Sequence, residues 1–152
     1  MKHFGEKFFQ IVAVLGVFIA STLVPFVTFK LFQSAFLLEP QGFWRFTPAT
    51  PIASVPMNWI IATIVANIII AIVAVLAYSL ASKAIPGSWL RKGFIFGSFA
   101  VFLGVYIPVW SMYTIMNLSG VMAICLALDG TFEYILYSLL IAFILRKKDI
   151  NS

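Results

Sequence analysis

The sequence predicts an all-α membrane protein, folded as a four-helix, up-down transmembrane bundle with both termini in the cytoplasm. Hydrophobic residues make up 62% of the 152 residues and charged residues only 10%, and the mean hydropathy is +1.07. Soluble domains carry about 25% charged residues. A soluble chain of this length has too little interior to bury so much apolar surface, so lipid must be its main solvent. The length predicts a single transmembrane domain over residues 1–152.

Four apolar stretches are long enough to cross a bilayer, because a hydrocarbon layer of about 30 Å requires about 20 helical residues. They cover residues 8–29, with a more polar extension to 38, and then 57–81, 90–117 and 121–145. The first stretch is longer than the apolar core of a signal peptide and lacks a clear A-x-A site, so we expect it to be retained as a helix.

Basic residues predict how the bundle is oriented. Lys30 and Arg45 lie in or near the first loop. The other basic residues flank span ends that would all lie on the opposite side of the membrane. These are Lys2, Lys7, Lys83, Arg91, Lys92, Arg146, Lys147 and Lys148. Cytoplasmic loops of membrane proteins carry the excess of Lys and Arg. The pattern therefore predicts a multi-pass protein of the cell membrane with cytoplasmic termini, and it explains the net charge of +5 without nucleic-acid binding.

The segment 39–56, EPQGFWRFTPATPIASVP, is the predicted outer loop. Its prolines oppose a long helix because each lacks an N–H group and fixes φ. Aromatic residues around Arg45 suit the lipid headgroup layer. We interpret the segment as an interfacial loop or lid over the bundle, and the alternative is a loop that binds a ligand or a partner.

Small residues form stripes on two of the predicted spans. In the third span they recur at helical spacing and include the GxxxG sequence GFIFG; in the second span they lie beside Asn67. The residues expected to pack helices are Gly93, Gly97, Ala100, Gly104, Ala62, Ala66 and Asn67. Small side chains let helix backbones approach closely in lipid. We expect spans two and three to meet along these stripes; the alternative is that the stripe of span three contacts another subunit.

Two carboxylates lie within the fourth span. Asp129, Glu133 and Tyr137 are spaced four residues apart, so they share one face of a helix. Because charge inside a bilayer is costly, we expect this face to point to the bundle interior or to a water-filled pocket. One hypothesis is that the acids bind a cation or relay protons, with Lys30 as a counter-ion.

Two other interpretations of the acids stay open. They are a structural pair neutralised by Lys30, Arg45 or Tyr137, or they mark a helix boundary. In the second case Asp129 and Gly130 form an N-cap and turn, and the preceding residues are re-entrant or interfacial.

The sequence contains few groups that do chemistry. Cys125 is the only cysteine and His3 the only histidine, which excludes an intrachain disulfide, a CxxC pair and a His-rich metal site in the bilayer. No arrangement of nucleophile and base resembles a hydrolase. We therefore assign no catalytic residue, metal or cofactor, and expect a protein that is not an enzyme.

The stretches KGFIFGSFAVFLGVYIP and LDGTFEYILYSLLIAFILRKK resemble small, uncharacterised four-span bacterial integral membrane proteins. This resemblance implies the four-span fold and carries no activity or site.

Two functions remain in addition to the disfavoured membrane enzyme. The first, slightly favoured, is a non-catalytic accessory or assembly subunit whose partners are the lipid bilayer and other membrane subunits or further copies of itself. The second is a small transporter or channel that uses the acidic pair.

Overall fold

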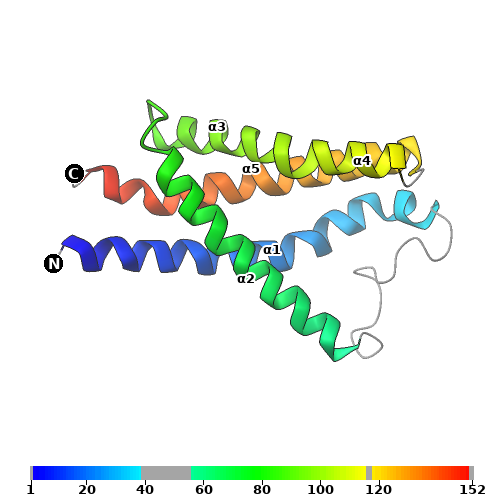
Figure 1. Ribbon diagram of the computed structural model, residues 1–152, viewed down its shortest axis with the longest axis horizontal. Coiled ribbons are helices and arrows are strands. Elements are labelled where there is room, and N and C mark those ends of the chain that lie inside the picture. Colours follow the sequence, from blue (N-terminus) through cyan, green and yellow to red (C-terminus); the bar gives the residue numbers. More distant parts are fainter. Residues whose placement is uncertain (1, 39–55, 116–117, 151–152) are drawn as a thin grey trace.

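The computed structural model describes residues 2–38, 56–115 and 118–150 (Figure 1). Side chains are described for residues 7–25, 27–28, 56–115 and 118–146. The elements, in chain order, are α1 (Lys2–Leu38), α2 (Met57–Ala81), α3 (Trp89–Val101), the π-helical turn η2 (Phe102–Tyr106), α4 (Ile107–Ile115) and α5 (Gly120–Ile150). The described part of the chain contains no strand.

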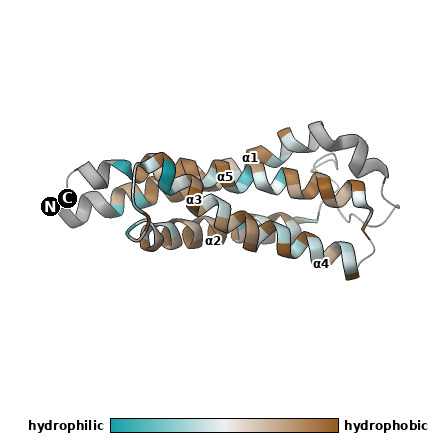
Figure 2. Cartoon of the chain, turned by 90° about the horizontal axis from the view of Figure 1, so that it is seen from above, coloured by the Kyte–Doolittle hydropathy of each residue, from teal (hydrophilic) through white to brown (hydrophobic). Residues whose placement is uncertain are grey.

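Four helical segments are long and apolar enough to cross a membrane. They are Lys7–Pro25, Met57–Ala81, Trp89–Ile115 and Gly120–Arg146, so α3, η2 and α4 together make one span. Hydrophobic residues run along most of their length, whereas hydrophilic residues gather near the turn between α2 and α3 (Figure 2). This confirms the predicted all-α chain with four spanning helices, and it is compatible with a polytopic membrane protein. The predicted outer loop lies almost entirely outside the described residues.

Helix α1 continues through Pro25, and its later part runs at an angle to its first part (Figure 1). A proline inside a helix removes one backbone hydrogen bond and crowds the preceding turn. Hydroxyl groups near the proline donate to carbonyls of their own helix: Ser21 and Thr22 donate to the carbonyl of Phe18, at 3.0 and 2.8 Å. Thr28 donates to the carbonyl of Val24 at 3.2 Å.

A second proline explains the π-helical turn within the third span. Pro108 cannot donate a backbone hydrogen bond, and its ring would clash with the carbonyl four residues earlier. The chain accommodates it by widening over Phe102–Tyr106, where the N–H of Ile107 donates to the carbonyl of Phe102, five residues back. Such single π turns relieve local crowding without ending the helix.

Glycines bring α3 and η2 into close contact with α5. A Cβ atom added at Gly93 would lie 2.9 Å from the Cβ of Ala142, and one at Gly97 would lie 2.9 Å from a terminal methyl of Ile135. Farther along, a Cβ at Gly104 would lie 2.8 Å from the ring of Tyr134. The stripe of small residues on the third span therefore fits directly against the fourth span.

The prediction that spans two and three meet along their stripes is wrong. Helix α3 packs chiefly on α5, whereas α2 contacts α1 and α5. Ala62 and Ala66 of α2 are exposed. Helical spacing indicates which residues share a face but does not identify the partner of that face. Here α5 offers the better match, because Ser138 and Ala142 are small where the glycines approach.

The helix-boundary interpretation of the acidic pair is also wrong. Helix α5 begins at Gly120, where the side chain of Ser119 accepts a hydrogen bond from the N–H of Met122 at 3.2 Å. Such an interaction is typical of an N-cap. The helix then continues without interruption through Asp129 and Gly130. Both acids consequently lie well inside a spanning helix.

The buried core joins α1, α2 and α5, and α3 contributes at its edge. The fully buried residues at this junction are Ala13, Val17, Ala71, Val75, Tyr78, Tyr137, Ile141, Ala142 and Leu145. The ring of Tyr78 meets that of Phe96 edge to face at 5.3 Å between centroids, which ties α2 to α3. By contrast, the first ten residues of α2, from Met57 to Ala66, are all exposed except Ile60. Half of α2 thus diverges from the rest of the bundle (Figure 1).

Candidate functional site

The four spans enclose a cavity of about 470 Å³, to which each of them contributes side chains. Most of its wall is apolar. The polar lining residues are Ser21 of α1, Asn67 of α2, and Glu133, Tyr134, Tyr137 and Ser138 of α5. We call this space the four-helix cavity.

Glu133 and Asn67 lie near the middle of the spans Gly120–Arg146 and Met57–Ala81, whereas Ser21 lies near the end of the span Lys7–Pro25. Glu133 precedes Arg146 by 13 residues and Ser21 follows Lys7 by 14, which places each roughly 20 Å from a basic helix end at about 1.5 Å per residue. Asn67 precedes Lys83 by 16 residues, or roughly 24 Å. These distances are shorter than the thickness of a hydrocarbon layer, which is about 30 Å.

Glu133 is the ionisable group of the cavity with the strongest claim to function. It is half-buried, and Tyr137, one turn later on α5, donates a side-chain hydrogen bond to it. The rings of Tyr134 and Tyr137 lie 6.4 Å apart between centroids. None of the described residues that line the cavity is basic, so the carboxyl group of Glu133 has no cationic partner on this wall.

Asp129 lies one turn from Glu133 but does not line the cavity. It shares a side-chain hydrogen bond with Thr28 of α1, a residue that is only 3% exposed. The other oxygen, Oδ1, is buried and has no hydrogen-bond partner among the described residues. The two acids that the sequence grouped together thus have separate surroundings: Glu133 faces the cavity and Asp129 faces α1.

The structure brings Asn67 and Ala100 to the same cavity as Glu133. The sequence had placed these two residues among those that pack helices, on other spans. Lys30, the expected counter-ion, is a residue of α1, but its side chain is not among those that the structure describes. Arg45 lies outside the described residues altogether. Tyr137, on the same helix, donates a side-chain hydrogen bond to Glu133.

Sequence reasoning missed three hydroxyl residues at or near the site: Ser21, Thr28 and Ser138. Each lies in a long apolar run, where a small hydroxyl residue is common because it can donate to a carbonyl of its own helix. The position of Ser21 and Ser138 on the cavity wall, and of Thr28 beside Asp129, depends on how the helices pack together. The one available signal was that Ser21 and Thr28 flank Pro25, where α1 changes direction.

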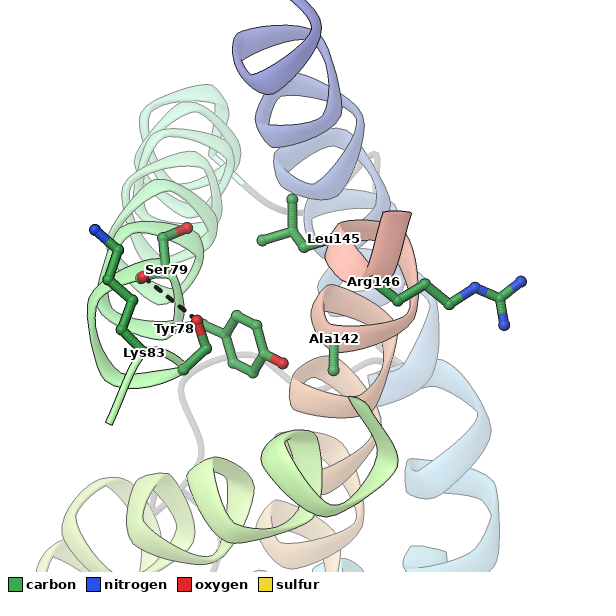
Figure 3. A pocket seen from close by; sticks show the side chains of 7 residues that line it. Tyr78, Ser79, Lys83, Ala142, Leu145 and Arg146 are labelled. Carbon is green, nitrogen blue, oxygen red and sulfur yellow. Dashed lines mark hydrogen bonds between the residues drawn. The ribbon is translucent and has the colours of Figure 1, made fainter. Parts of the chain in front are cut away.

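A second, smaller pocket lies between the ends of α2 and α5 (Figure 3). Its volume is about 50 Å³, and its lining residues are Tyr78, Ser79, Ser82, Lys83, Ala142, Leu145 and Arg146. Lys83 and Arg146 extend in different directions (Figure 3), and the guanidinium carbon of Arg146 lies 4.0 Å from the centroid of the Phe143 ring. The two cations do not converge on one point, so this pocket is a poorer candidate than the four-helix cavity.

The donor groups in the cavity restrict what it can hold. Among the described residues, no group of three His, Cys, Asp or Glu side chains is placed to bind a metal ion. Carboxyl, amide and hydroxyl oxygens are present, but they come from separate helices around a wide space. The arrangement is suited to one ionic contact by Glu133, with the remaining polar groups available for hydrogen bonds.

Comparison with known protein families, with curated proteins and with solved structures finds no match for this chain. The fold and the cavity therefore define its class from physical features alone. It has the features of a polytopic membrane protein with a mainly apolar cavity, lined by a few polar residues, between its helices.

Proposed function

We propose that this protein is a small transporter or channel of the cell membrane, in which Glu133 binds a cation or a proton. The observation that carries the proposal is the position of the Glu133 carboxyl group on the wall of the four-helix cavity. Ionisable residues within membrane spans are costly, and they commonly mark substrate, ion or proton pathways. A bundle that needed only packing would be more stable with an apolar residue at this position.

In this proposal the chain is an up-down bundle with both termini in the cytoplasm. The distribution of Lys and Arg supports this orientation through the positive-inside rule. The start of α1, the turn between α2 and α3, and the end of α5 lie at the same end of the molecule (Figure 1). These three segments carry most of the basic residues.

Labelling of single cysteines tests the orientation. In a Cys125→Ala background, we expect Ala84→Cys, in the turn after α2, to react with a membrane-impermeant thiol reagent only after cells are permeabilised. Gly120→Cys, at the start of α5, should react in intact cells. Both positions are exposed, so access to the reagent depends on the side of the membrane. The reverse pattern would contradict cytoplasmic termini.

Transport by the purified protein in vesicles tests the function. The external pH, or the external concentration of one cation at a time, is changed abruptly. We expect the membrane potential or the internal pH of the vesicles to change by more than in empty vesicles. The cations are Na⁺, K⁺, tetramethylammonium and tetraphenylphosphonium. Because Glu133 is the only carboxyl group on the described cavity wall, at least one of these ions or the proton must interact with it. No response to any of them would reject the proposal.

An accessory or assembly subunit is the second candidate function. The observation that favours it is the exposure of nearly all residues from Met57 to Ala66 of α2, a surface that another membrane subunit or a second copy could contact. The vesicle experiment separates the two functions, because an accessory subunit would support no flux when it is reconstituted alone.

A further inference from the structure

The wall of the four-helix cavity is unusually rich in apolar and aromatic surface for a cation site. Phe96 of α3 and Tyr134 and Tyr137 of α5 provide three aromatic rings, and aliphatic residues of α1 and α2, such as Val17 and Val73, complete the wall. Phe96 is held by its edge-to-face contact with Tyr78. A ligand in this space would be surrounded mainly by carbon.

This wall is poorly suited to a small inorganic cation. Such ions take about six or more oxygen ligands at about 2.0–2.6 Å. Here the polar groups are Glu133, Asn67, two serines and the phenols, and they are distributed over three helices around a space of about 470 Å³. A strongly hydrated ion would face apolar walls in place of most of the oxygen atoms that it needs.

A bulky cation with an apolar body would satisfy the same wall. Its charge would pair with the carboxylate of Glu133, and its body would bury apolar area against the aliphatic residues, which is favourable in proportion to the area removed from water. Aromatic ring faces attract cations within about 6 Å, most strongly where water is excluded. The cavity volume of about 470 Å³ falls within the range of about 300–1,000 Å³ that is typical of small-molecule sites.

Three residues of α2 that line the cavity, Ile69, Ile70 and Val73, are also exposed on the surface of the bundle. Asn67 lies on the cavity wall, and the residues just before it, back to Met57, are exposed apart from Ile60. An apolar cation concentrates in the membrane, so it would reach Glu133 between α2 and the other spans without crossing a polar vestibule.

We infer that the four-helix cavity binds a lipophilic organic cation, paired to Glu133 and enclosed by the rings of Phe96, Tyr134 and Tyr137. This inference rests on the proposed cation or proton site and specifies its substrate class. Glu133 and the wall have separate roles: the carboxylate selects the sign of the charge, and the aromatic and aliphatic residues select the apolar body.

Binding of three probes to the purified protein in detergent tests both roles. Tetraphenylphosphonium should bind saturably, whereas tetraphenylborate, which has a similar shape and the opposite charge, should not. Tetramethylammonium, which has the same charge and little apolar surface, should bind at least about tenfold more weakly, because a tenfold change needs only about 1.4 kcal/mol. Equal binding of tetraphenylphosphonium and tetraphenylborate would show that both probes partition into the detergent, and it would overturn the inference.

Two variants locate the binding in the cavity. Glu133→Gln should weaken tetraphenylphosphonium binding at least about tenfold. Ala100→Leu, which fills part of the cavity from α3, should also weaken it while Glu133 is intact. The helical content and melting temperature of each variant identify any loss of fold, and Ser98→Ala, at an exposed position of α3 off the cavity, is the matched control. Unchanged binding in folded Glu133→Gln would overturn the inference.

The outcomes separate the substrate class from the proposed function. If vesicles respond to protons, Na⁺ or K⁺ and tetraphenylphosphonium shows no saturable binding, the inference of a lipophilic cation fails and the cation or proton site stands. If no ion produces a response and no probe binds, both fail. Saturable binding that depends on Glu133 supports the substrate class directly.

Discussion

Gly97→Leu will strongly reduce the amount of folded protein recovered from membranes. A Cβ atom at Gly97 would lie 2.9 Å from the Ile135 side chain and 3.1 Å from the Cβ of Ser138, and leucine adds three further carbons in the same direction. Overpacking of a well-packed contact costs about 1–3 kcal/mol, and more where the backbone must move. Since α3 and α5 share the most extensive helix contact of the bundle, the helices must separate.

The measurement is the yield of monodisperse protein in mild detergent, together with its melting temperature. Gly120→Leu is the matched control, because a Cβ at that glycine would meet no atom of another described helix within 4 Å. It should give nearly wild-type yield. A Gly97→Leu protein with the same yield and melting temperature as the control would show that close approach of α3 to α5 is not required for folding.

Glu133→Gln will abolish most cation or proton flux while the protein stays folded. Glutamine has the shape of glutamate, and its amide oxygen can still accept the hydrogen bond of Tyr137. It has no negative charge and cannot exchange a proton at neutral pH. We expect the rate in vesicles to fall at least about tenfold, which corresponds to about 1.4 kcal/mol, with little change in melting temperature.

Asp129→Asn provides the comparison that isolates the cavity. Asp129 is the neighbouring acid on the same helix face, but it hydrogen-bonds with Thr28 and does not line the cavity. Its neutral variant should retain most of the flux, and its effect should appear in the melting temperature. Equal loss of flux in both variants would mean that the two acids act as a unit, and full flux in Glu133→Gln would reject Glu133 as the binding group.

The acidic pair shows how far sequence reasoning extends toward the candidate site. The spacing of Asp129, Glu133 and Tyr137 placed them on one helix face, and the cost of charge in lipid predicted that this face would be enclosed. Helix α5 passes through all three residues, and Tyr137 contacts Glu133. The different surroundings of the two acids could not be predicted, because they depend on whether α1 or the cavity lies against each turn of α5.

The glycine stripe of the third span illustrates the same difference for the fold. Its residues lie at helical spacing, so the sequence predicted a face suited to close contact. The choice between α2 and α5 as partner depends on the shape of both surfaces, and the match of Gly93 and Gly97 with Ala142 and Ser138 arises between residues 49 and 41 positions apart.

The sequence by itself determined the all-α fold class of this protein and the number of its helices that are long and apolar enough to cross a membrane. Both follow from local quantities, the hydropathy and length of each apolar run, because the backbone of every span satisfies its own hydrogen bonds in lipid. The tertiary structure alone decided which helices pair, how far α2 diverges, and that Ser21, Asn67 and Glu133 share one cavity. Those features depend on side-chain contacts between distant segments, and no periodicity within a single segment contains them.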